Sequence, residues 1–295
     1  MKTTMWLVLV LTLVMAVSVA TVQASGHGEA KPKMTEVLLV AFGSSMPQAQ
    51  AAFDNIAEEV KNAVGPDIPV HWAYTSHIIR KKLAKQGREL DSPAEALAKM
   101  ADRGVTHVAV QSLHTIAGAE YHDLLSVVNG FSAMADGFEQ IEVGLPLLGA
   151  QEDMERVVEA ALASIPKARK SEEAVILMGH GTHHPANAFY LALMWLLQQQ
   201  DENIFLGTVE GFPMVKEVLE MLNRKGVKRA WLMPFMSVAG DHARNDMAGD
   251  GEDSWKSVLT KAGIECETVL RGTAEYDDYV AIWVDHLKDA LAELE

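Results

Sequence analysis

The sequence predicts an α/β protein made of two similar Rossmann-like halves, each a four-stranded parallel sheet flanked by helices, with a cleft between them. Two observations predict this fold. Near-continuous apolar, β-branched runs alternate with helical patterns, which is typical of parallel strands covered on both faces. The runs also fall into two sets of four that can be laid on each other. A ligand is then expected in the cleft, outside the carboxyl ends of the strands.

Eight strands are expected along the chain, because each of these runs is short and bounded by turn residues. In order they are 36–42, 68–75, 105–113, 141–148, 174–180, 203–210, 227–235 and 264–271.

The two sets of strands match in the glycines and prolines that follow or precede them. The stretch "VLLVAFGSSMP" aligns with "VILMGHGTHHP", which pairs Gly43 with Gly181 and Pro47 with Pro185. The stretch starting at Gly104, "GVTHVAVQSLHTIAGAEYHDL", aligns without a gap with "GVKRAWLMPFMSVAGDHARND". Glycines and prolines in register favour an internal duplication over two unrelated βαβ units.

The expected organisation has four parts. Residues 1–24 read as a cleavable signal peptide, since a short basic start precedes an apolar stretch that is shorter than a spanning helix, and "VQA" offers a cleavage site. Residues 25–34 form a mature N-terminal segment, 35–165 the first half, and 166–295 the second half. The junction is expected near the polar stretch 163–174. We therefore expect an exported, periplasmic protein without a membrane span after cleavage.

Composition narrows the classes of partner. The formal net charge is −15, which becomes −16 when Lys2 leaves with the signal peptide. A strongly acidic chain is not expected to bind nucleic acid, because phosphate binding needs a basic surface. Cys266 is the single cysteine, so no intrachain disulfide can form. No phosphate-binding loop of the G-x-x-x-x-G-K-[ST] type occurs, which argues against the use of ATP.

Three metal-type side chains follow three strands of the second half. His180 follows the first strand, Glu210 ends the second, and His242 follows the third. Carboxyl ends of parallel strands share one sheet edge, so two imidazoles and a carboxylate would converge there and suit a divalent transition metal. The first half carries Phe42 and Glu120 in place of the two histidines. We therefore expect the first half to wall the cleft without holding the metal.

The motifs also resemble a known family. "GHGTHHPAN", "VEGFP" and "SVAGDHARNDMAGD", each after a strand, are similar to those of the anaerobic sirohydrochlorin cobaltochelatases, which belong to the ATP-independent chelatases that include ferrochelatase. The resemblance runs through essentially the whole mature chain. It implies a chelatase-like fold and lyase-class insertion of Co²⁺ into sirohydrochlorin or a close precursor. It also implies metal ligation by His180, Glu210 and His242. Export departs from the family, whose tetrapyrrole synthesis is cytoplasmic.

Metal insertion removes two pyrrole protons, so a base is needed beside the ring. Near neutral pH a neutral histidine can either bind the metal or accept a proton. We assign His180 as first ligand and proton acceptor and His242 as second ligand. Glu210 would balance the metal's charge and relay a proton. His183 and His184 are expected to be exposed or accessory. Cationic side chains that could contact the substrate's carboxylates are Arg80, Lys81, Lys82 and Arg244, although solvated positions on a helix surface explain the lysines more readily.

Because the protein is expected to be exported, two other functions are also compatible with the sequence. A periplasmic carrier of haem or metal would keep the fold, and a periplasmic solute-binding protein would share two α/β halves and a signal peptide. His122 lies near the start of an expected helix, beside Tyr121. An accessible imidazole is the usual axial ligand of haem, so we expect haem binding through His122, at the interface of a homo-oligomer and apart from the His180 site.

Overall fold

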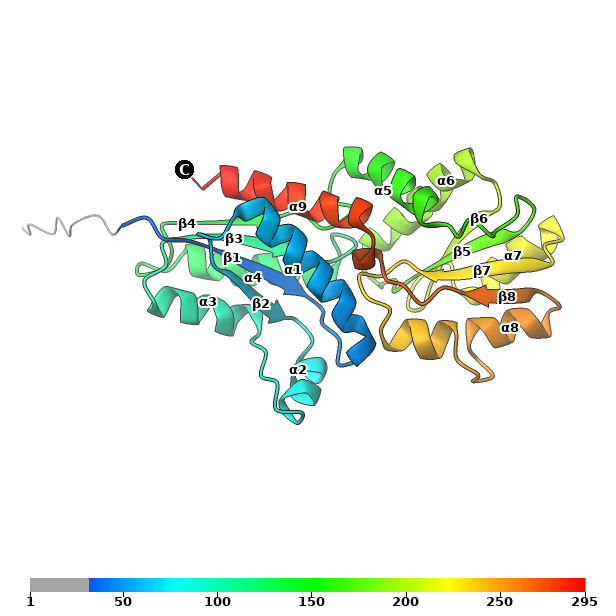
Figure 1. The fold of residues 1–295 in the computed structure, drawn as a ribbon, viewed down its shortest axis with the longest axis horizontal. Coiled ribbons are helices and arrows are strands. Elements are labelled where there is room, and N and C mark those ends of the chain that lie inside the picture. The colour runs from blue at the N-terminus through cyan, green and yellow to red at the C-terminus, as the bar shows by residue number, and fades with distance from the viewer. Residues whose placement is uncertain (1–31, 295) are drawn as a thin grey trace, which may run out of the picture. The chain divides into compact units, whose positions relative to one another are not determined.

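The computed structural model describes residues 32–294, so the expected signal peptide lies outside the described residues. The fold class is confirmed: two four-stranded parallel sheets follow one another along the chain (Figure 1). The first sheet has the order β2-β1-β3-β4 and the second the order β6-β5-β7-β8. The strands are β1 Thr35–Ala41, β2 Val70–Tyr74, β3 His107–Ser112, β4 Gln140–Gly144, β5 Ala174–Gly179, β6 Ile204–Thr208, β7 Arg229–Pro234 and β8 Glu265–Thr268.

Helices cover both faces of the two sheets. They are α1 Gln50–Val64, α2 His77–Ala84, α3 Pro93–Asp102, α4 Ala119–Ser132, α5 Gln151–Ser164, α6 Ala188–Gln200, α7 Val215–Lys225, α8 Trp255–Lys261 and α9 Asp277–Ala292. Short turns complete the set: η1 Pro47–Ala49, η2 Pro185–Asn187, η3 His242–Met247 and η4 Thr273–Glu275. None of these helices, within the described part of the chain, has the length and apolar character that crossing a membrane requires.

Alternation along each strand divides the core into layers. In β1, Val37 and Leu39 belong to a large cluster shared by both halves, whereas Leu38 and Val40 face a separate cluster under α3 and α4. In β5 the alternate residues likewise separate into the shared cluster and a third cluster under α7 and α8. Burial of both faces explains why the strands read as unbroken apolar runs.

The duplication extends to backbone detail. Gly43 and Gly181, which follow β1 and β5, have φ of 97° and 79°, so both turns use the left-handed region that glycine favours. Pro47 and Pro185 each begin a 3₁₀ turn four residues later. The halves differ after the third strand, where the first half continues as α4 and the second as η3, a single π-helical turn.

The last helix crosses back to the first half. Although α9 follows β8 of the second sheet in sequence, it packs against β3, β4, α1 and α5. Its His286 contacts the Asp153 carboxylate of α5 at 3.1 Å and the Leu145 carbonyl at 3.0 Å, and both side chains are buried. The C-terminal helix therefore ties the segment between the two sheets to the first half.

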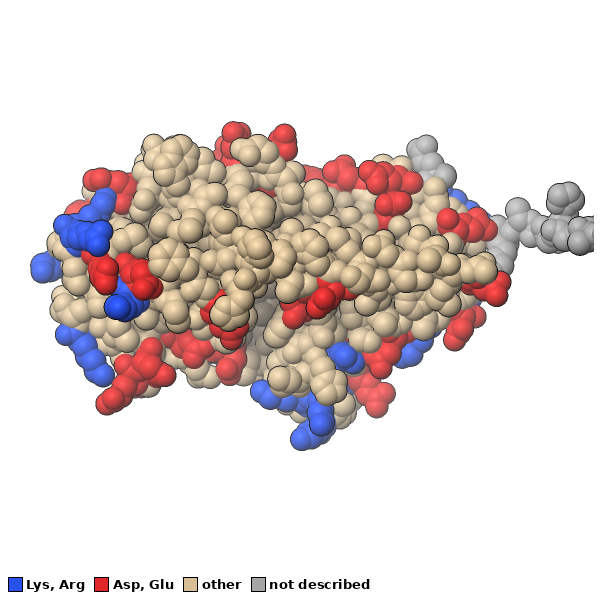
Figure 2. Space-filling view, turned by 180° about the vertical axis from the view of Figure 1, so that it is seen from behind, with Lys and Arg blue, Asp and Glu red and all other residues tan. Residues whose placement is uncertain are grey.

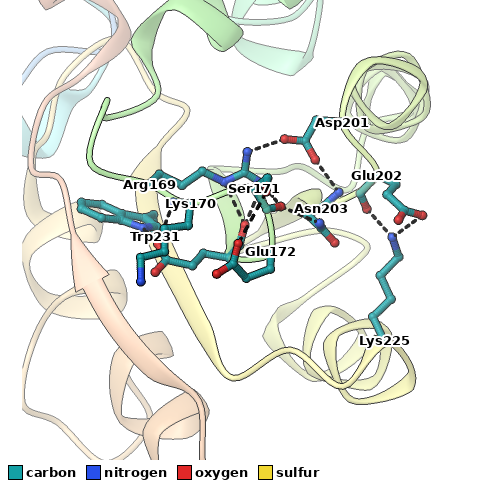
Figure 3. A network of polar contacts seen from close by, with 10 residues as sticks. Arg169, Lys170, Ser171, Glu172, Asp201, Glu202, Asn203, Lys225 and Trp231 are labelled. Carbon is teal, nitrogen blue, oxygen red and sulfur yellow. Dashed lines mark hydrogen bonds and ion pairs between the residues drawn. The ribbon is translucent and has the colours of Figure 1, made fainter.

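The expected polar junction is anchored by side chains. Arg169 donates to the Asp201 carboxylate and, at 2.7–2.9 Å, to the Glu173 carbonyl (Figure 3). The Trp231 indole in turn donates to the Glu173 carboxylate at 2.7 Å. These contacts fix the chain as it enters β5, the strand that leads to His180.

Candidate metal centre

The carboxyl edges of the two sheets face each other, and contacts between loops show it. The Phe42 ring, after β1, lies with its centroid 6.3 Å from that of His180, after β5. A Cβ placed on Gly240 would lie 3.5 Å from Ser44 Oγ, and one placed on Gly118 would lie 4.0 Å from the Thr182 methyl. Residues from both halves therefore line the expected site.

His180 and His242 lie side by side at this edge. Their ring centroids are 4.8 Å apart and their planes nearly perpendicular, at 82°. His180 is placed by the tight turn at Gly181, where an added Cβ would lie only 2.6 Å from Thr208 Cβ and 2.9 Å from Gly211 N. His242 opens η3, with Asp241 as the residue before it. Two half-buried imidazoles thus meet although 62 residues separate them in sequence.

Hydrogen bonds fix which ring nitrogen of each histidine is available. His180 Nδ1 lies 3.0 Å from the Gly181 carbonyl oxygen, and His242 Nδ1 lies 2.5 Å from the Asp246 carboxylate. Both partners can only accept, so each Nδ1 carries a proton, and in a neutral imidazole the lone pair is then on Nε2. A carboxylate behind a histidine is a frequent arrangement at metal sites, because it orients the ring and raises its basicity. In both rings Nδ1 is bonded to an acceptor, and no hydrogen bond within residues 32–294 engages either Nε2.

Asp246 is the residue of this site that sequence reasoning missed. It lies four residues after His242, on the same face of the turn, and an i, i+4 His–Asp spacing in "DHARND" was the signal that could have identified it. The preceding residue, Asn245, donates to the Asp241 carboxylate at 2.9 Å. The π-helical turn thus carries two carboxylates with different roles.

Glu210 is exposed on the loop after β6, and its backbone N–H donates to the His180 carbonyl at 2.7 Å. Its side chain lines a hollow of about 570 Å³ together with His183, His184 and the apolar side chains Phe212 and Met214. Within residues 32–294, no three His, Cys, Asp or Glu side chains lie close enough together to hold a metal ion. The structure brings the two imidazoles together and leaves the Glu210 carboxylate outside that pair.

The remaining predicted histidines lie beside this hollow. His183 is exposed, whereas His184 Nδ1 accepts the Ala186 N–H at 3.2 Å, so a neutral His184 carries its proton on Nε2. His122, near the start of α4, is exposed and donates from Nδ1 to the Gly118 carbonyl at 2.8 Å. The rings of His122 and His184 approach across the two halves, with centroids 5.0 Å apart.

The apolar side of α4 faces inward. Tyr121 is buried, and Leu124 and Val128 pack in the cluster under the first sheet. His122 is at the surface of α4, whereas Leu124 and Val128 of the same helix belong to the protein's own core and do not face a ligand beside His122.

Comparisons with known proteins identify the family. The cobalt chelatase (CbiK) family model matches residues 35–292. The chain is 47% identical over 259 residues to the sirohydrochlorin cobaltochelatase CbiKC of Nitratidesulfovibrio vulgaris, covering 88% of this chain and 91% of the relative. It is 37% identical over 256 residues to the sirohydrochlorin cobaltochelatase of Salmonella typhimurium, covering 86% and 96%.

Among solved structures, SirB from Bacillus subtilis with Fe3+ matches 88% of this chain and 96% of its own, with a TM-score of 0.57 and 14% identity. At that identity the match speaks for the fold alone. The family expected from the sequence motifs is thus confirmed, and the chain belongs to the cobalt chelatase (CbiK) family.

Proposed function

We propose that this protein is a sirohydrochlorin cobaltochelatase, which inserts Co²⁺ into sirohydrochlorin or a close precursor, with release of two protons and without ATP. Membership of the family and the named activity of two relatives support this activity. The observation that carries it is the pair of imidazoles, His180 and His242, at the facing sheet edges: each has Nδ1 bonded to an acceptor and, among the described residues, no partner on Nε2.

The two histidines divide the chemistry. The His180 Nε2 lone pair binds the incoming Co²⁺ and, as the metal passes to the ring nitrogens, accepts one pyrrole proton, while the second goes to the Glu210 carboxylate. His242 holds the metal from the second side, and the Asp246 carboxylate supports the positive charge that the ring shares with the metal. Each Co²⁺ inserted replaces two pyrrole protons, so the macrocycle's charge is balanced without any other reactant.

Glu210 completes the proposed site. The Glu210 backbone N–H donates to the His180 carbonyl, so the two residues are close, and Glu210 lines the hollow described above. From there it takes a proton from the pyrrole or the histidine to solvent, and it balances the dipositive ion as a third ligand when the metal binds. Replacement by Gln removes both actions and keeps the side chain's shape.

The test is anaerobic insertion of Co²⁺ into sirohydrochlorin by purified protein, followed by the absorbance of the product. Wild type should turn over without ATP, whereas His180→Ala and His242→Ala should each lose most of the activity while remaining folded by circular dichroism. His183→Ala is the matched control in the same loop and should keep it. Full activity in both ligand variants would refute the assignment.

We further propose that His122 binds haem as an axial ligand, at an interface between copies of the chain. His122 is exposed and its Nδ1 donates to a carbonyl, so its Nε2 can coordinate the iron of a haem. The His184 ring lies beside the His122 ring. A Soret band should form when haem is added to wild type, and it should be weaker in His122→Ala. Haem-dependent assembly is read by size-exclusion chromatography. An identical spectrum in the variant would contradict the proposal.

Export is the third proposal. The basic start and apolar stretch of residues 1–24 support removal of a signal peptide after Ala24 and a periplasmic location. Expression of the full sequence in a Gram-negative host should yield periplasmic protein whose N-terminus is Ser25. A full-length chain retained in the cytoplasm would contradict it.

A further inference from the structure

The helix α2 begins at the edge that carries the candidate metal centre. Ser76 caps its N-terminus, and the Ser76 backbone N–H donates to the Phe42 carbonyl at 3.2 Å. Phe42 is the residue whose ring lies against His180. An eight-residue helix extends about 12 Å, so all of α2 lies within a short reach of that edge. In Figure 1 it projects below the layers of sheet and helix.

The exposed side of α2 is cationic and hollowed. A hollow of about 340 Å³ is lined by Lys81, Lys82 and Lys85 together with His77 and Ile78. Within residues 32–294, no hydrogen bond or ion pair engages the ammonium group of any of these three lysines. Figure 2 shows Lys and Arg side chains gathered at the lower edge of that view, where α2 lies, whereas acidic side chains predominate along much of the rest of the outline.

The neighbouring Arg80 is different. Its guanidinium pairs with the Glu95 carboxylate at 3.1 Å and its side chain is only 19% exposed, so it fastens α2 to α3. It was one of the cations expected to contact substrate, and the structure gives it this structural contact instead. Lys81 and Lys82 of α2, and Lys85 directly after its last residue, are the cations here that no other described residue engages.

A purely structural role explains the lysines only in part. Cations near a helix C-terminus are favourable because they oppose the helix dipole, and Lys81 and Lys82 are in the last turn. That role does not explain Ile78, which is 66% exposed beside the lysines, nor the concave surface that they share. An apolar side chain among unpaired cations suits a ligand with an apolar body and several anionic arms. Sirohydrochlorin is such a ligand, since acetate and propionate groups surround its macrocycle.

We propose that α2 is the carboxylate-recognition element of this protein: Lys81, Lys82 and Lys85 bind the acidic arms of the tetrapyrrole and Ile78 contacts its edge. This inference rests on the proposed chelatase function and adds the residues that select and orient the substrate. A chain of net charge −15 otherwise repels a polycarboxylate, and local cations overcome that repulsion within the screening length of about 8 Å. Anchored by its arms on α2, the ring is held at the edge where His180 and His242 lie.

The experiment measures equilibrium binding of metal-free sirohydrochlorin under anaerobic conditions, with no Co²⁺ present. The test variant is Lys81→Gln/Lys82→Gln/Lys85→Gln. The matched control, Lys61→Gln/Lys228→Gln/Lys261→Gln, removes the same charge from exposed lysines elsewhere, two of them also in the last turns of helices. Because an exposed ion pair contributes a few-fold each, Kd should rise roughly tenfold in the test variant at low salt and stay near the wild-type value in the control.

Two further results separate this inference from the proposed function. The difference between the variants should shrink as salt is raised, and in turnover the loss should fall on KM. If wild type binds the tetrapyrrole in a lysine-dependent way but inserts no cobalt, the function fails and this inference stands. If wild type inserts cobalt and the test variant matches the control in Kd and KM, the function stands and this inference is overturned.

Discussion

Asp246→Asn tests whether the carboxylate behind His242 prepares that ring to bind metal. The amide oxygen of Asn can still accept the Nδ1–H, so the ring keeps its place and only the negative charge is lost. Removing such a partner costs 10- to 100-fold in metal affinity or activity. The His242 and Asp246 side chains are 34% and 45% exposed, so solvent screens the pair and we expect the lower end, about tenfold or ~1.4 kcal/mol.

The assay is Co²⁺ titration by calorimetry, together with the initial rate of cobalt insertion. Asp241→Asn is the matched control, because Asp241 is at the start of the same turn and its carboxylate contacts Asn245 rather than a histidine. Asp246→Glu should restore part of the lost affinity, which a purely structural role would not predict. A Kd and rate for Asp246→Asn within twofold of those of Asp241→Asn would refute the reasoning.

Three further predictions concern the fold that supports the site. Gly181→Ala should lower the free energy of unfolding in urea by about 3 kcal/mol, because the added methyl group makes a close contact and φ is unfavourable for alanine. Gly65→Ala, where φ is 81° but the surrounding space is open, should lower it by about 1 kcal/mol. Equal losses would contradict the packing argument. Burial lowers the pKa of His114 from 6.5 to about 4, so below pH 6.5 the unfolded chain takes up a proton that the native chain does not. The free energy of unfolding should therefore fall by up to about 1.4 kcal/mol per pH unit from pH 6.5 toward pH 4. Urea titrations at several pH values should show that this free energy depends less on pH in His114→Leu than in wild type; an unchanged pH dependence would refute this. His286→Gln, which breaks a buried pair, should cost about 3 kcal/mol by thermal or urea unfolding, against at most about 1 for Asp285→Asn in an exposed pair on the same helix; similar values would mean that the buried pair stabilises little.

The repeated pattern made the fold predictable. Each strand is buried on both faces, so its sequence is an apolar run that stands out, and all eight expected strands are present. Registration of Gly43 with Gly181 predicted two equivalent turns because a positive φ is needed at the same place in each half. Local chemistry of this kind can be read from a single sequence.

Contacts between distant segments were not predictable in the same way. The return of α9 to the first sheet depends on which apolar surfaces match in three dimensions, and a helical pattern does not name its partner. The approach of His180 to His242 followed from the rule that parallel strands end at one edge. The approach of His122 to His184 did not, because it depends on how the two halves face each other.

The most direct test of the central idea is a crystal structure with Co²⁺ bound, located by anomalous scattering at the cobalt edge. The two free Nε2 atoms predict one principal cobalt site, coordinated by His180 and His242, with the Asp246 carboxylate still on His242 Nδ1 and Glu210 turned toward the ion. Cobalt bound at His183 or elsewhere, with no density between the His180 and His242 rings, would contradict the account.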